Sequence, residues 1–157
     1  MASKREELIR FVGEATSQLS ALIPELVFIL DHVCYRVEKD SEYPLVKELF
    51  NRCGRNVLEE EVSGRMVSLF KLDLSLTFGK YTLWYVEIPA PKEGKPFKAG
   101  FEHIDVVIET PLADFIATYS FLTFDTVNLS KGKRPEISLK LPSGRVVKFA
   151  NTPLVPK

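Results

Sequence analysis

The sequence predicts an α+β protein in which two βαβββ modules follow an N-terminal helix. Three observations support this prediction. The two histidines of the chain, His32 and His103, both follow an acidic residue and precede a β-branched residue in a strand-like segment. Each of these segments is followed by a helix-like stretch and then by three strand-like stretches. Residues 90–97 form a linker rich in Pro, Gly and Lys, after which the pattern of the first half begins again.

Composition narrows the class of protein and its expected surroundings. The 157 residues are 45% apolar and 27% charged, which fits one soluble domain or two small adjoining modules. The formal net charge is zero, so we expect neither a nucleic acid nor an anionic membrane as partner. The chain has two cysteines, Cys34 and Cys53, and we expect both to be reduced thiols and not a disulfide. No targeting segment is visible and the longest apolar run, residues 26–30, is short, so a cytoplasmic location is expected.

An N-terminal helix is expected within residues 1–24. Ser3 and Glu6 have the spacing of a capping box, and Pro24 ends the helical pattern. One apolar stripe runs along this helix through Leu8, Val12, Ala15, Leu19 and Leu22.

The first module is assigned to residues 25–89. Its first strand alternates, so that His32, Cys34 and Arg36 share one face. A helix is predicted to begin at residues 41–44, with a buried stripe and with Gly54 as its C-terminal cap. The members of that stripe are Leu45, Leu49, Phe50 and Cys53. Three further strands are predicted at residues 56–62, 65–74 and 81–88.

The second module is assigned to residues 98–157 and repeats this order. A strand through His103 runs to Glu109, and Thr110 with Pro111 begins a helix. Short strands are predicted at residues 125–129, 136–141 and 145–149.

A single βαβββ unit cannot cover its own sheet, whereas two units side by side can form a curved mixed sheet around a cavity. This arrangement resembles the vicinal-oxygen-chelate superfamily, which includes glyoxalase I and extradiol dioxygenases. In that superfamily the metal ligands come from the first and last strands of each module. The resemblance points here to His32, Glu87, His103 and, at the place that matches Glu87, Lys148.

Two imidazoles and one carboxylate make a 2-His-1-carboxylate set with open coordination positions. Such a set suits a divalent metal such as Fe(II), Zn, Mn or Ni, and its open positions would accept the oxygens of a small-molecule substrate. Period-2 alternation allows His32, Glu87 and His103 to face one cavity while their sequence neighbours face away.

Lys148 leaves two interpretations open, because a charged lysine cannot be a metal ligand. In the first, the site holds a metal on three ligands and Lys148 anchors an anionic substrate. In the second, Lys148 pairs with Glu87 in a metal-free site. Arg36 and Asp105 lie in phase with the two histidines. They are candidate substrate-binding residues, with an Arg36–Asp105 ion pair as the alternative. No residue is assigned as catalytic.

Several motifs are similar to those of the YecM family of bacterial proteins. They are residues 30–36, 64–72, 86–91 and 100–108, with Lys148-Phe149 near the end. The resemblance implies the paired-module fold and a metal site at His32, Glu87 and His103. Family members carry a histidine directly after the Lys-Phe pair, where this chain has Ala150.

These observations lead to three hypotheses about function. The first is a metal-dependent isomerase, lyase or dioxygenase that acts on a small oxygen-bearing molecule. The second is a metal-free protein that sequesters a small molecule in the same cavity. The third is a structural module without an active cavity. The sequence decides neither the substrate nor whether the protein forms a homodimer.

Overall fold

The computed structural model describes residues 3–130 and 132–155. The chain divides into two compact units. The first combines Met1–Asp31 with His103–Lys157, and the second is the continuous segment His32–Glu102. The border between the units therefore runs through two strands, β1 (Ile29–Arg36) and β5 (Gly100–Val107). The predicted boundaries at residues 24, 89 and 97 stay predictions.

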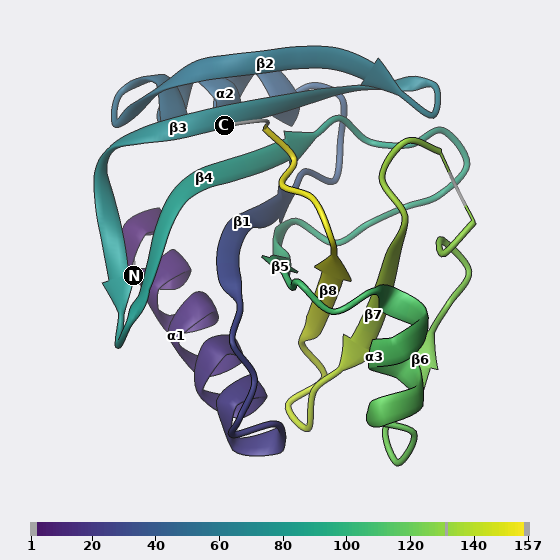
Figure 1. The fold of residues 1–157 in the computed structure, drawn as a ribbon. Coiled ribbons are helices and arrows are strands. Elements are labelled where there is room, and N and C mark those ends of the chain that lie inside the picture. Colours follow the sequence, from purple (N-terminus) through teal and green to yellow (C-terminus); the bar gives the residue numbers. More distant parts are fainter. Residues whose placement is uncertain (1–2, 131, 156–157) are drawn as a thin grey trace. The chain divides into compact units, whose positions relative to one another are not determined.

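The second unit contains the first βαβββ module from His32 onward. After β1 come α2 (Glu42–Asn51), β2 (Gly54–Val62), β3 (Arg65–Phe78) and β4 (Tyr81–Pro89). The strand order is β2-β3-β4-β1, and β1 pairs in parallel with β4 while the other pairs are antiparallel. Figure 1 shows β2, β3 and β4 side by side, with α2 behind β2 and β3.

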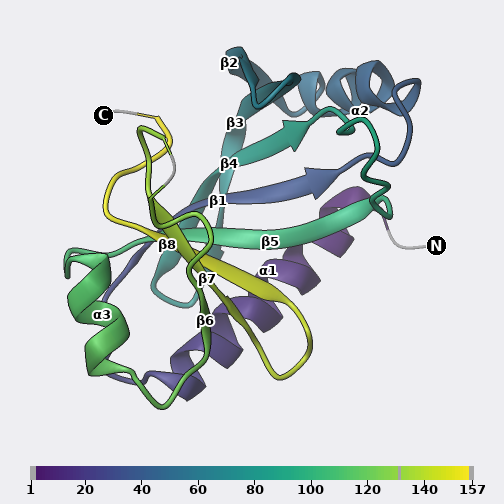
Figure 2. The same ribbon diagram turned by 90° about the vertical axis from the view of Figure 1, so that its right-hand side faces the viewer.

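The first unit repeats this topology in its described residues. After β5 come α3 (Leu112–Thr118), β6 (Phe124–Asp125), β7 (Glu136–Lys140) and β8 (Val146–Ala150). The strand order is β5-β8-β7-β6, with β5 and β8 parallel (Figure 2). In both modules the first strand thus lies beside the fourth, so the predicted internal repeat and the α+β class are confirmed.

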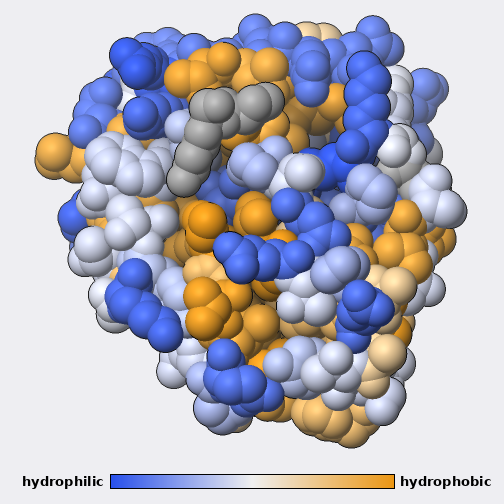
Figure 3. Space-filling model, in the orientation of Figure 1, coloured by the Kyte–Doolittle hydropathy of each residue, from blue (hydrophilic) through white to orange (hydrophobic). Residues whose placement is uncertain are grey.

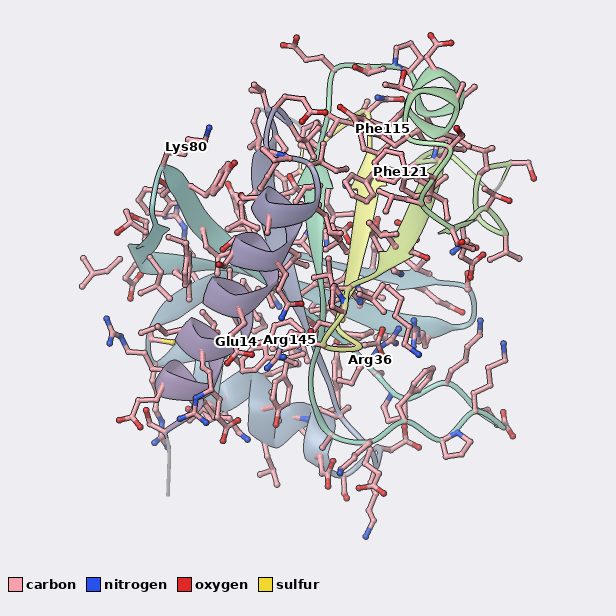
Figure 4. The ribbon with its side chains drawn as sticks, turned by 90° about the horizontal axis from the view of Figure 1, so that it is seen from below. Glu14, Arg36, Lys80, Phe115, Phe121 and Arg145 are labelled. Carbon is pink, nitrogen blue, oxygen red and sulfur yellow. The ribbon has the colours of Figure 1, made fainter. Side chains whose placement is uncertain are left out.

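The N-terminal helix α1 (Lys4–Leu22) begins where the capping box predicted, because the Ser3 hydroxyl accepts a 3.1 Å hydrogen bond from the Glu6 amide. Its buried face consists of Leu8, Val12, Ala15, Thr16 and Leu19. The helix contacts the end of the second module in its own unit. Glu14 and Arg145 form a 2.7 Å ion pair, which Figure 4 labels. None of the described helices is both long and apolar enough to cross a membrane.

The predicted buried stripe of α2 is wrong for three of its four members. Leu45 is 70% exposed, Leu49 is 37% exposed and Cys53 is exposed, whereas Phe50 is buried. Phe50 packs with its ring near those of Tyr35 and Phe70, so this one aromatic side chain supplies the core contact of the helix. The predicted stripe therefore lies on a face of the helix that is mostly open to solvent.

Gly54 is the first residue of β2 and not a helix cap, which corrects the prediction. Its Cα faces the backbone of Lys71 on β3, and a β-carbon at this position would overlap the Lys71 carbonyl oxygen. The glycine is therefore required by the close approach of two strands.

Strand β6 is shorter than the predicted strand at residues 125–129. The Asp125 carboxylate accepts a hydrogen bond from the Val127 amide at 2.9 Å, and the Leu129 amide donates to the Thr126 carbonyl. This local side-chain bond turns the chain away from the ladder. In the second unit, the edge strand β2 is exposed or half-buried along its whole length. In Figure 3 the surface over β2, at the top of the view, is largely hydrophilic.

Candidate metal centre

His32 and Glu87 lie together on one face of the second unit. Strands β1 and β4 are parallel with Cys34 opposite Glu87, and His32 is two residues before Cys34, so the three side chains share a face. The His32 Nε2 and Glu87 Oε2 atoms are 3.8 Å apart. The His32 side chain is 2% exposed and that of Glu87 is 18% exposed. The structure thus brings two of the three predicted metal ligands together, and their role as ligands stays a prediction.

The separation of these two donor atoms suits a shared metal ion. At 3.8 Å the atoms are too far apart for a direct hydrogen bond. Two ligands that each bind one ion at about 2.1 Å lie roughly 3.4 Å apart at a tetrahedral angle. A small movement would therefore bring both atoms to one ion, and an imidazole with a carboxylate is a donor set that fits the metals named above.

His103 occupies the corresponding place in the first unit. Its side chain is 3% exposed, and its Nε2 atom lies 3.4 Å from the Asp105 Oδ1 atom. Asp105 accepts a 2.9 Å hydrogen bond from the Nη1 group of Arg134 at its other oxygen. The second histidine is thus buried beside a carboxylate that is itself held by an arginine.

The register of the two modules shows that Lys148 is the equivalent of Glu87. Cys34 lies opposite Glu87 in the β1–β4 pair, and Asp105 lies opposite Lys148 in the β5–β8 pair. Cys34 and Asp105 each come two residues after a histidine. The second module therefore places an ammonium group where the first places a carboxylate, as the sequence predicted.

Lys148 pairs with a carboxylate of its own unit. Its Nζ atom lies 3.2 Å from Oε1 of Glu136 on the neighbouring strand β7. The Lys148–Glu87 pair that the sequence offered as an alternative stays a prediction. Ala150, at the end of β8, is buried and offers no side-chain ligand.

Arg36 binds Glu102 through two hydrogen bonds, of 2.6 Å from Nε and 3.1 Å from Nη2. Its guanidinium also lies 4.4 Å from the centre of the Phe97 ring. Burial lowers the pKa of Arg36, but the opposing effects of Cys34, Glu102 and Glu87 outweigh it, so the pKa is raised overall. Arg36 thus binds Glu102, and Asp105 binds Arg134. The Arg36–Asp105 ion pair that the sequence offered as an alternative stays a prediction.

Sequence reasoning missed Arg134 and Glu136. Arg134 precedes β7 and contacts three carboxylates, those of Asp31 at 3.6 Å, Asp105 at 2.9 Å and Glu136 at 3.5 Å. An arginine in a turn-rich segment belongs to no periodic pattern. Two of its three partners, Asp31 and Asp105, are also 29 residues or more away in the sequence. No signal in the sequence could have marked it.

Two βαβββ modules, each with its first and fourth strands paired in parallel and each with a buried histidine in the first strand, define the class of the protein as the vicinal-oxygen-chelate fold. The chain belongs to the YecM protein family, because the profile of that family matches residues 4–155.

Two curated relatives carry the family likeness. The chain is 28% identical over 108 residues to Protein YecM of Escherichia coli K12, a match that covers 69% of this chain and 56% of that protein. It is 30% identical over 79 residues to an uncharacterised protein of Haemophilus influenzae, covering 50% of this chain and 41% of the relative. The chain thus matches about half the length of each relative.

Three solved structures share the fold. A structural-genomics protein has a TM-score of 0.71 at 21% identity, and the match covers 98% of this chain and 93% of that one. A hypothetical protein from Bacillus halodurans has a TM-score of 0.57 at 13% identity, with coverage of 84% and 99%. A candidate dioxygenase from Bacillus subtilis has a TM-score of 0.51 at 18% identity, with coverage of 82% and 42%. At these identities the likeness extends to the fold alone.

Proposed function

We propose that the protein binds one divalent metal ion through His32, Glu87 and His103 and acts on a small oxygen-bearing molecule as an isomerase, a lyase or a dioxygenase. Each of the three residues offers one ligand atom. Together they supply two imidazole nitrogens and one carboxylate oxygen. The observation that carries the proposal is the pair of buried His32 and half-buried Glu87, whose donor atoms are 3.8 Å apart. The fold shared with a candidate dioxygenase supports it.

The proposal draws one ligand from each histidine-bearing strand. His103 follows Glu102 directly in the chain, and Glu102 is held by the two hydrogen bonds from Arg36. The chain entering His103 is thus fixed by a bidentate ion pair, which is the kind of support that a ligand position needs.

The metal would act as a Lewis acid that polarises an oxygen of the substrate. The residues of the chain would shield the ion from water and balance its charge. His32 and His103, both buried, would exclude water from one side of the site, and the Glu87 carboxylate would balance part of the ion's charge. The proposed substrate-binding residues are Arg36, Lys148 and Asp105.

The test is the metal content of the purified protein. The protein would be stripped with a chelator, reloaded with Fe(II), Zn, Mn or Ni in turn, and measured by elemental mass spectrometry. We expect about one metal ion per chain in the native protein and almost none in His32→Ala and Glu87→Gln. Glu59→Gln is the matched control, because Glu59 is a surface carboxylate that binds Lys47. Absence of metal under every loading would contradict the proposal.

A metal-free binding protein is the second candidate. It is favoured by one observation, that Lys148 stands where the second module would otherwise repeat Glu87. In that case the stripped protein would bind small molecules as well as the reloaded protein does. Under either proposal we expect a cytoplasmic protein with a small-molecule ligand and without a membrane or nucleic-acid partner, and size-exclusion chromatography would decide between a monomer and a homodimer.

A further inference from the structure

A second arginine, Arg65, lies on the same face of the second unit as Glu87. Strands β3 and β4 are antiparallel, with Leu69 opposite Glu87 and Val67 opposite Pro89. Residues that face each other in such a pair point to the same side of the sheet, and every second residue of a strand does so too. Arg65, two residues before Val67, therefore belongs to the Glu87 face.

Arg36 reaches the same face from the other neighbour of β4. Cys34 lies opposite Glu87 in the β1–β4 pair, and Arg36 comes two residues after Cys34. The two arginines thus stand on the strands that flank β4, at the end of β4 that lies beyond Glu87. Arg36 is 8% exposed and Arg65 is half-buried.

Both guanidinium groups have a buried N–H group without a hydrogen-bond partner among the described residues. Arg36 uses Nε and Nη2 on Glu102, which leaves Nη1. Arg65 donates from Nη1 to the Ala90 carbonyl at 3.5 Å, which leaves Nε. A buried donor that makes no hydrogen bond costs free energy, so an acceptor placed between the two groups would stabilise both.

The charges around these groups favour a negatively charged acceptor. Burial lowers the pKa of Arg65 and the positive charge of Arg36 lowers it further, and the opposing effects of Cys34, Glu87 and Glu102 do not make up for this, so the pKa is lowered overall. Glu102 is engaged by Arg36, and Glu87 is a ligand in the proposed metal site. Once Glu87 is committed to a cation, Arg65 has no carboxylate partner of its own among the interactions of the described residues.

We propose that Arg36 and Arg65 bind the carboxylate group of a small molecule beside Glu87. Two N–H donors on two planar guanidinium groups match the two oxygens of a carboxylate. The Phe97 ring stacked on Arg36 forms one wall of this site. The class of substrate rests on the proposed metal function. If the site holds a metal, the substrate is an acid that carries a second oxygen able to bind the metal, such as a hydroxy acid or a keto acid.

The test compares salicylate with salicylamide, which has the same ring and hydroxyl group but no negative charge. Their binding to the metal-loaded protein would be measured by isothermal titration calorimetry. We expect salicylate to bind at least about tenfold more weakly to Arg65→Gln than to the native protein, which is the loss of one charge-assisted hydrogen bond. Arg65→Lys would recover part of this affinity. Salicylamide would bind weakly to all of them.

Arg55→Gln is the matched control, because Arg55 is an exposed arginine on β2 of the same unit. Its affinity for salicylate should equal that of the native protein. Circular dichroism and the metal content of Arg65→Gln should also match the native values, so that a loss of salicylate affinity is not a loss of fold or metal.

The outcomes separate this inference from the metal proposal. Equal salicylate affinity in native protein and Arg65→Gln, or no salicylate binding to native protein that holds metal, would overturn the arginine site and leave the metal site standing. Salicylate binding that disappears in Arg65→Gln, in a protein that takes up no metal under any loading, would support the arginine site and overturn the metal proposal.

Discussion

Arg134 donates a 2.9 Å hydrogen bond from Nη1 to Oδ2 of Asp105, the residue two places after His103 in β5. Its Nε group donates at 3.0 Å to the Thr152 carbonyl in the C-terminal segment. Asp31 adds to this cluster, because its carboxylate lies 3.6 Å from Arg134 and accepts a hydrogen bond from the Leu154 amide. One arginine thus holds two strands and the C-terminal segment of the first unit together.

Replacing this arginine should destabilise the protein. Arg134→Ala would leave Asp31 and Asp105, which are 9% and 3% exposed, without their shared cation. Removal of one partner from a buried ion pair costs about 3 kcal/mol or more. We expect a decrease of this size in the free energy of unfolding, measured by urea denaturation.

Arg145→Ala is the matched control for this experiment. Arg145 pairs with Glu14, whose side chain is 46% exposed, and the Arg145 guanidinium lies over the Phe11 ring. An ion pair open to solvent contributes about 0–1 kcal/mol. A loss in Arg134→Ala no larger than that in Arg145→Ala would show that the Arg134 cluster does not stabilise the fold.

His103→Ala should abolish metal binding while leaving the fold largely intact. The proposed set has three protein ligands, and two remaining ligands hold a divalent ion far more weakly. Metal content by elemental mass spectrometry would fall close to zero, and the far-ultraviolet circular dichroism spectrum would stay that of the native protein. Full retention of metal in this variant would rule out the assigned site.

Gly54→Ala should destabilise the pairing of β2 with β3. The added methyl group would overlap the Lys71 carbonyl oxygen. Neither the methyl group nor the carbonyl can rotate away as a flexible side chain would, so the two strands must separate. Such overpacking costs about 1–3 kcal/mol. Thermal unfolding would show a lower midpoint, whereas Leu74→Ala, at a position of β3 that is 82% exposed, should leave it nearly unchanged.

The two cysteines should differ in their reaction with iodoacetamide. Cys34 is completely buried, so it should react only after unfolding. Cys53 is exposed, but desolvation and the nearby Asp73 raise the pKa of its thiol. Since only the thiolate reacts, a raised pKa makes Cys53 react slowly near neutral pH and faster as the pH rises towards that pKa.

Intact-mass measurements over time at pH 7 and pH 9 would check this order of reactivity. A single alkylation that is much faster at pH 9 is expected in the native protein, and a second one only in denaturant. A reaction at pH 7 as fast as that of free cysteine would contradict the assignment for Cys53.

The repeat was predictable because it depends on local patterns. Alternation in the first strand of each module, together with helix starts at Ser41 and Thr110, fixes the order of the elements. Alternation allowed His32 and Glu87 to share one face, and the β1–β4 register places them there.

What failed depends on contacts that no local pattern records. The apolar residues of α2 have helical spacing, yet Leu45 faces solvent and Phe50 alone enters the core. Gly54 resembles a helix cap until its neighbour Lys71, 17 residues later, is known. Arg134 has no spacing to mark it, because its role comes from partners on other elements. Local sequence therefore predicts the elements and the ligand types better than the charged groups that surround them.

The division of the first unit into two chain segments has a consequence for synthesis on the ribosome. The segment His32–Glu102 emerges whole, whereas α1 must wait for the far end of the chain. The Gln18–Ser143 hydrogen bond joins residues 125 positions apart. At cellular elongation rates this gap lasts on the order of 10 s, during which Gln18 lacks its hydrogen-bond partner and α1 is exposed to chaperones.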